Sequence, residues 1–80
     1  MTLAFVFIEC IKDLAQSAEK AVKQVQGVTE AHSTKDNGAY DLIVKVHTSD
    51  ERQFKDAILA LKSIVGVAAV MTAIVHGNFQ

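Results

Sequence analysis

Apolar residues alternate along four short segments of the chain. In residues 2–10 both alternating sets are apolar, with Leu3, Phe5 and Phe7 on one side and Ala4, Val6 and Ile8 on the other. Strands that are buried on both faces have this pattern. Residues 67–75 share it, residues 40–47 also form a good strand, and residues 28–35 are more polar. We therefore predict four strands over these ranges, with 28–35 at an edge of the sheet.

Two segments between these strands have helical spacing instead. The first contains Leu14, Ala18, Ala21, Val22 and Val25, with polar residues on the opposite side. Asp13 with Gln16, and Thr48 with Glu51, have the spacing of N-terminal capping boxes. The second helix takes its apolar stripe from Phe54, Ala57, Ile58 and Leu61. We expect Gly27 and Gly66 to end the two helices, because glycine is common where helices stop.

The two halves of the chain are similar to each other. At an offset of 39 residues, Leu3 matches Leu42, and Gly27-Val28 matches Gly66-Val67. Two βαβ halves with right-handed crossovers interleave into a ferredoxin-like arrangement. We predict a single α+β domain over residues 1–80: a βαββαβ sandwich with a four-stranded antiparallel sheet, both helices on one face and the first strand central.

This architecture leaves one face of the sheet without helices. The first and last strands are nevertheless apolar on both sides. A bare apolar sheet face is typical of an interface. We expect a homodimer packed through the sheets, which assembles further.

The segment before the third strand is the main candidate for a ligand site. Asn37-Gly38 is a dipeptide that favours a tight hairpin turn, and Tyr40-Asp41 follows at the entrance to the strand. A turn rich in backbone donors, an aromatic ring and a carboxylate suit a small ligand; the alternative is a simple hairpin with an Asp at the strand entry. Thr72 adds a hydroxyl inside the apolar last strand, where we expect it to need a partner.

Composition excludes several other functions. The formal net charge is −1 with no basic cluster, which disfavours direct nucleic acid binding. Cys10 is the single cysteine, and the three histidines fit no metal-ligand spacing, so we expect no metal and no cofactor. No catalytic constellation is evident, which disfavours an enzyme. The longest apolar run is too short for a membrane helix and lacks a basic leader, so we expect a cytoplasmic protein.

The order and spacing of several short motifs resemble those of a known family. The motifs are Ala4-Phe5-Val6, Gly38-Ala39-Tyr40-Asp41-Leu42, Leu61 followed by Gly66-Val67, and Thr72-Ala73-Ile74-Val75. Together they resemble the effector-binding (RAM) domain of the Lrp/AsnC, or feast/famine, transcriptional regulators. The chain starts directly at the first strand, so we expect the stand-alone version, without the helix-turn-helix.

The resemblance implies sheet-mediated dimers that associate into rings such as octamers or decamers. It also implies small effectors, commonly amino acids, bound between dimers. Carried over to this chain, it nominates Gly38, Ala39, Tyr40, Asp41 and Thr72 as ligand-binding residues, with Met71 and Ile74 as further lining. In that site the turn amides would bind the carboxylate of an amino acid, Asp41 or a backbone carbonyl its ammonium group, and Tyr40 its side chain.

These observations predict a non-enzymatic, homo-oligomeric sensor domain for an amino acid or related metabolite. It would modulate a DNA-binding Lrp/AsnC relative by co-assembly. Two alternatives remain at this point. One is a small dimeric α/β-barrel enzyme of the monooxygenase or isomerase type, which would place polar residues between sheet and helices. The other is an oligomerisation partner that binds nothing.

Overall fold

The computed structural model describes residues 1–34 and 41–76. Its elements, in order, are β1 (Thr2–Cys10), η1 (Lys12–Leu14, a 3-10 turn), α1 (Ala15–Val22), β2 (Val28–Ser33), β3 (Leu42–Thr48), α2 (Glu51–Lys62) and β4 (Val67–His76). This order confirms the predicted βαββαβ arrangement. The predicted strand boundaries agree within two residues, although residue 35, the expected end of the second strand, lies outside the described part.

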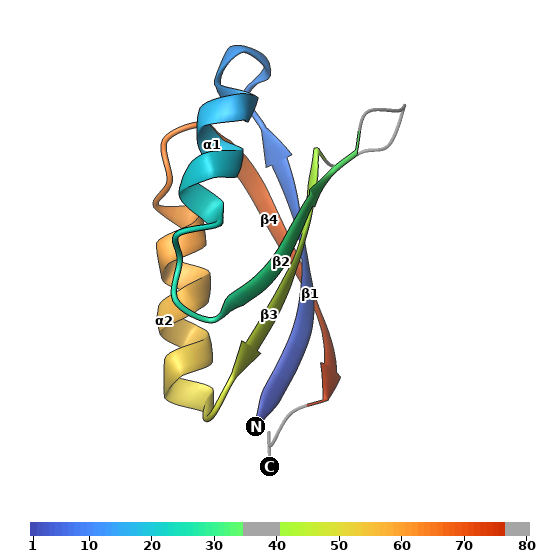
Figure 1. Ribbon diagram of the computed structural model, residues 1–80, viewed down its shortest axis with the longest axis vertical. Helices are drawn as coiled ribbons and strands as arrows, with labels where there is room; N and C mark the ends of the chain where they lie inside the picture. Colours follow the sequence, from blue (N-terminus) through green and yellow to red (C-terminus); the bar gives the residue numbers. More distant parts are fainter. Residues whose placement is uncertain (35–40, 77–80) are drawn as a thin grey trace.

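The four strands form one antiparallel sheet in the order β2-β3-β1-β4. β1 therefore pairs on both sides, with β3 and with β4, which confirms its predicted central place. β2 and β4 are the edges. Figure 1 shows α1 and α2 together on one side of the sheet, with the other side left bare. The structure thus has two layers, as a ferredoxin-like fold requires.

The hydrophobic core lies between the sheet and the two helices. It takes alternate residues from the central strands and one stripe from each helix, as the two side-chain periodicities dictate. Its buried members are Ala4, Val6, Ile8, Cys10, Ala18, Val22, Leu42, Val44, Val46, Phe54, Ala57 and Leu61. The α/β-barrel enzyme alternative requires polar residues between the sheet and the helices. In this structure the residues between these layers are almost entirely aliphatic.

The structure corrects both predicted helix caps. Asp13 lies within η1, and α1 begins after Leu14 without a side-chain cap. α2 is capped by Asp50 rather than Thr48: the backbone N–H of Gln53 donates to the Asp50 carboxylate at 2.8 Å, and the N–H of Ser49 donates to Gln53 Oε1 at 3.1 Å. The capping side chains are thus those of Asp50 and Gln53, each two residues later than expected.

Gly27 and Gly66 lie at equivalent turns that lead into the edge strands. Their φ values are +99° and +102°, a region that side chains rarely adopt. Neither residue directly ends a helix, because α1 stops at Val22 and α2 at Lys62. Each glycine instead closes a turn in which Val28 and Val67, respectively, donate to the carbonyl three residues earlier at 3.1 Å. The glycines therefore set the entry into β2 and β4.

The corrected caps can be tested by replacing Asp50 or Asp13 with alanine. Asp50→Ala should lower the free energy of unfolding by about 1 kcal/mol, because the N–H of Gln53 loses its acceptor. In a domain of this size that corresponds to a fall in Tm of roughly 4–8 °C. Asp13→Ala is the control and should change Tm far less. Thermal unfolding at equal protein concentration measures both, and a larger effect at Asp13 would contradict the assignment.

Candidate functional site

The residues nominated from the sequence divide into two groups. Gly38, Ala39 and Tyr40 lie outside the described residues. Asp41 and Thr72 are described, and each lies beside β1 but on opposite sides of it.

Asp41 is fixed by three hydrogen bonds at the start of β3. Its N–H donates to the carbonyl of Ile8 at 2.8 Å, and its carbonyl accepts from the N–H of Thr34 at 2.8 Å. Its Oδ2 accepts from the backbone N–H of Cys10, also at 2.8 Å. The carboxylate therefore has a structural role in a half-buried place. Its other oxygen, Oδ1, has no hydrogen-bond partner within residues 1–34 and 41–76.

The thiol of Cys10 is buried next to this carboxylate. Burial, then the negative charges of Asp41 and Glu19, raise the pKa of Cys10 above its ordinary value. A thiol with a raised pKa holds less thiolate at neutral pH and is a poorer nucleophile. This geometry favours an inert thiol at Cys10 over a nucleophile.

Thr72 lies on β4, opposite Val6 of β1. It is exposed, so the expectation of a buried hydroxyl that must find a partner is wrong. β4 is an edge strand, and the helices do not extend over its second half. Met71 and Ile74, named as further lining, are also about half exposed, at 54% and 49%.

One copy of the chain does not bring Asp41 and Thr72 together. β1 separates their strands, and Asp41 precedes Leu42, the partner of Ile8, whereas Thr72 pairs with Val6. Strand geometry places their Cα atoms about 14 Å apart, from two strand spacings and three residues along the strand. A ligand that touches both side chains therefore needs a second copy of the chain or the hairpin residues between 34 and 41.

The side of the sheet that faces away from the helices is here called the open face. Its apolar centre comes from three strands, in the register Phe7 with Ile43 and Phe7 with Met71. Leu3 and Phe5 continue it along β1. Phe5 is 37% exposed in spite of its central place in the sheet. This is the bare apolar surface that the sequence predicted.

Charged side chains border the open face on the β2 side. Lys45 Nζ lies 3.5 Å from Glu30 Oε2, and His32 Nε2 lies 3.1 Å from Glu30 Oε1. The contact with His32, followed by the charge of Lys45, lowers the pKa of Glu30. Glu30 and His32 are exposed and Lys45 is partly exposed, so these pairs contribute little stability in one copy. They give the open face an apolar side over β1 and β4 and a charged side over β2 and the middle of β3.

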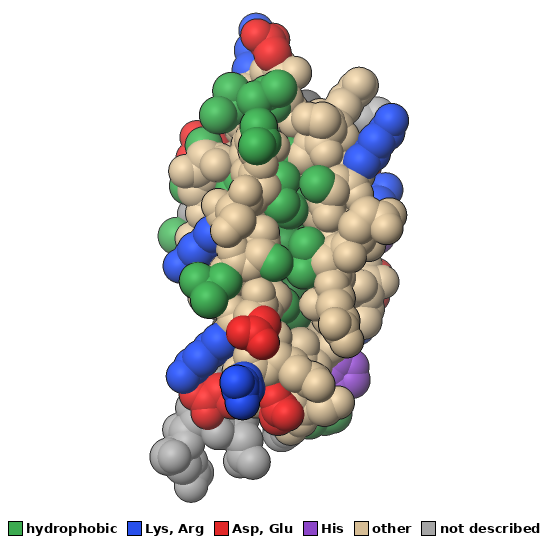
Figure 2. Space-filling model, turned by 90° about the vertical axis from the view of Figure 1, so that its left-hand side faces the viewer, with side chains coloured by type: hydrophobic (Ala, Val, Ile, Leu, Met, Phe, Trp, Pro, Cys, Tyr) green, Lys and Arg blue, Asp and Glu red, His purple; other side chains and the backbone are tan. Residues whose placement is uncertain are grey.

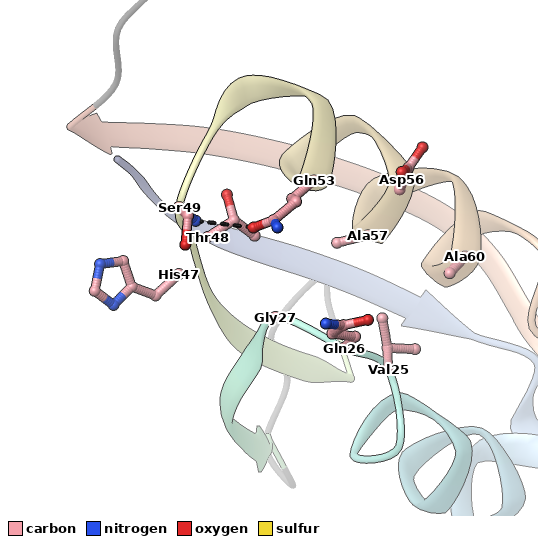
Figure 3. Close-up of a pocket in the computed structure, with 10 residues that line it drawn as sticks. All are labelled: Val25, Gln26, Gly27, His47, Thr48, Ser49, Gln53, Asp56, Ala57 and Ala60. Atoms are coloured by element: carbon pink, nitrogen blue, oxygen red, sulfur yellow. Dashed lines mark hydrogen bonds between the residues drawn. The ribbon is translucent and has the colours of Figure 1, made fainter.

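Sequence reasoning missed a cleft at the other end of the helix layer. It has a volume of about 410 Å³ and lies between the α1–β2 loop, the β3–α2 turn and the first two turns of α2. In Figure 3 the side chains of Ala57 and Ala60 point from α2 toward Val25 and Gln26, while the ring of His47 points away. The dashed line marks the bond from Ser49 to Gln53 that caps α2. The signal for this cleft is the polar Gln53 at a position where the other half of the chain has Leu14.

Two findings limit the chemistry of the described residues. No group of three or more His, Cys, Asp or Glu side chains lies close enough to hold a metal ion in residues 1–34 and 41–76. In the same residues, neither helix has the length and apolar character needed to cross a membrane.

Comparison with protein families identifies the domain. The model of the Lrp/AsnC ligand binding domain matches residues 3–79. The chain belongs to this family. A comparison of this chain with curated protein sequences finds no match.

Solved structures share the fold of this Lrp/AsnC domain. The protein TTHA0845 of Thermus thermophilus is 26% identical, with a TM-score of 0.85 over 100% of this chain and 99% of that one. Escherichia coli AsnC is 23% identical, with a TM-score of 0.83 over 96% of this chain and 52% of that one. The Neisseria meningitidis transcriptional regulator NMB0573, solved as a complex with L-Met, is 20% identical, with a TM-score of 0.79 over 99% of this chain and 52% of that one.

The structural role of Asp41 leads to a testable difference between two substitutions. Asp41→Ala should lower the free energy of unfolding by about 1–2 kcal/mol, because the partly buried N–H of Cys10 loses its acceptor. Asp41→Asn keeps an oxygen acceptor at the same place and should cost clearly less. Denaturant unfolding at one protein concentration measures both variants. If the two variants have equal stability, the Asp41–Cys10 bond does not hold these strand ends together.

Proposed function

We propose that this Lrp/AsnC domain is a homo-oligomeric sensor that binds an amino acid or a related small metabolite. The observation that carries the proposal is the fixed carboxylate of Asp41, whose Oδ1 is free of partners in the described part of the chain. The ammonium group of an amino acid is a suitable partner, since hydrogen bonds between charged groups are the stronger ones. That a relative of the same fold was solved with L-Met supports this class of ligand.

The proposed site includes Gly38, Ala39, Tyr40, Asp41 and Thr72. Asp41 would accept the ammonium group, and Thr72 would contribute an exposed hydroxyl from a neighbouring copy, because one copy holds the two side chains apart. The roles of Gly38, Ala39 and Tyr40 are predicted from the sequence alone. In this prediction the backbone amides of the turn bind the carboxylate of the ligand. The site is thus completed by assembly.

The open face supplies a surface for that assembly. Leu3, Phe5, Phe7, Ile43 and Met71 form an apolar surface that the helices of the described residues leave partly exposed. A stable interface of standard size buries about 800 Å² on each partner, and one copy exposes 5336 Å² in total. Two open faces packed together would need only about a seventh of that surface. We propose sheet-to-sheet dimers, which associate into octamers or decamers.

The proposed biological role is regulation of transcription through other proteins. A shared open face would let this chain form mixed oligomers with a DNA-binding Lrp/AsnC relative, so that ligand binding modulates the relative. The aliphatic layer between sheet and helices favours this role over the enzyme alternative, which requires a polar interior. We also propose that the protein acts in the cytoplasm and that the domain comprises residues 1–80.

Ligand binding can be measured by calorimetry against the twenty amino acids. We expect saturable heat for one or a few of them. Asp41→Asn should weaken that binding about 10- to 100-fold, because it removes one charged hydrogen bond of about 1.5–3 kcal/mol while keeping the bond to Cys10. Asp13→Asn, an exposed carboxylate at the same end of the molecule, is the control. The absence of heat and of thermal stabilisation for all twenty would refute an amino acid ligand.

Dimerisation can be tested by sedimentation at low micromolar concentration. Phe5→Glu places a charge in the centre of the open face and should shift the protein to monomers, since burying a charge is costly even beside Lys45, its cross-strand neighbour. Leu59→Glu changes an apolar side chain that is 61% exposed on α2, and should leave the sheet dimer intact. A wild-type protein that sediments as a monomer, or a Phe5→Glu variant that still dimerises, would contradict the proposal.

A further inference from the structure

The cleft beside α2 exists because the two halves of the chain fill equivalent junctions differently. At the offset of 39 residues, Gly27 corresponds to Gly66, Gln53 to Leu14 and Ala57 to Ala18. A Cβ atom on Gly66 would meet Leu14 Cβ at 2.9 Å and Ala18 Cβ at 3.3 Å, so that junction is full. A Cβ on Gly27 would meet Thr48 Cγ2 at 2.9 Å, but Ala57 Cβ only at 3.7 Å, so this junction is filled from β3 and stays open toward α2.

Gln53 leaves this space open because its side chain is used elsewhere. Its Oε1 accepts from the N–H of Ser49 at the start of α2, so the side chain turns toward that turn and away from Gly27. The side chain of Leu14 has no polar atom that could make such a hydrogen bond, and it packs against Gly66. Figure 2 looks onto the helix-covered side, and hydrophobic side chains are visible in a furrow down its middle, with charged side chains gathered at the lower end.

The cleft combines an apolar floor with polar edges. Val25, Ala57 and Ala60 supply small apolar side chains, and Gln26 and Asp56 supply polar groups on opposite edges. Its volume of about 410 Å³ lies in the range of small-molecule sites. Along α2 it extends from Gln53 to Ala60, roughly 10 Å at the helical rise.

The charge of the lining is negative. Asp56 is the one acidic residue in the lining. His47 also belongs to the lining, but its ring points away from the cleft. Glu19 and Glu51 each pair with a lysine four residues later, at 3.2 and 3.4 Å. Asp56 has Ala60 at that position, and it makes no ion pair with Arg52 or with any other residue in the described ranges.

We propose that this cleft is a second ligand site, which takes a small organic cation: an ammonium group on a short aliphatic chain. The chain lies over Val25, Ala57 and Ala60, and the ammonium group contacts Asp56 at the mouth of the cleft. The site is separate from Asp41 and does not rest on the amino acid proposal. It lies within one copy, at the opposite end of the helix layer.

The probe is pentylamine, titrated into ¹⁵N-labelled full-length protein, with pentanol and pentanoate as matched controls of the same chain length. We expect saturable chemical-shift changes with a dissociation constant on the order of millimolar. The changes should be confined to the backbone of residues 25–27 and 48–60. Pentanol should bind more weakly and pentanoate weakest, because Asp56 repels a carboxylate. Equal shifts with pentanoate, or no saturable shifts with pentylamine, would overturn the proposal.

Variants assign the binding to named side chains. Asp56→Asn should weaken pentylamine binding roughly three- to fivefold, as for an exposed ion pair, while Glu51→Gln on the same helix leaves it unchanged. Gln53→Leu should abolish the shifts by filling the junction as Leu14 does in the other half. If the lost cap unfolds that variant, Ala60→Leu fills the cleft from a position that makes no cap. Undiminished binding in Asp56→Asn or in a folded filled variant would refute the site, while binding of amino acids at Asp41 would be unaffected.

Discussion

The apolar character of β1 on both faces is the constraint from which the rest of the structure follows. Ala4, Val6 and Ile8 are fully buried under the helices. Phe5 and Phe7 have the same apolar character but face the side that the chain leaves bare. Two short helices can cover only one side of a four-stranded sheet. The helices therefore cover one face only, and in our proposal a second copy covers the other.

The central place of β1 also explains why the proposed ligand site is incomplete in one copy. Asp41 is fixed where β3 begins, by bonds to Ile8, Thr34 and Cys10. Thr72 lies across β1, on an edge strand that the helices leave exposed. Rigid placement of the Asp41 carboxylate, whose Oδ1 has no partner among the described residues, favours recognition, because little ordering is needed when a ligand binds. In our proposal assembly supplies the remaining groups, so that ligand binding and oligomerisation become coupled.

The sequence predicted the architecture because alternation and helical spacing are set by burial, which the whole chain shares. Details with a local origin were less predictable. Asp13, Thr48 and Asp50 are all acceptable caps by residue type, and the geometry of the β3–α2 turn selected Asp50. The burial of Thr72 was wrong because sequence alternation does not reveal how far two helices extend over an edge strand. Gly38, Ala39 and Tyr40 stay predictions, since they lie outside the described residues. The cleft was missed although Gln53 opposite Leu14 in the repeat is a readable signal.

The central claim is that a second copy covers the open face, and intermolecular contacts measure it most directly. An isotope-filtered NOE experiment on a mixture of labelled and unlabelled protein reports only contacts between copies. The account predicts NOEs between the rings of Phe5 or Phe7 in one copy and the methyl groups of Ile43 or Met71 in the other. Intermolecular NOEs confined to the helix side, or none at a concentration where the protein sediments as an oligomer, would contradict it.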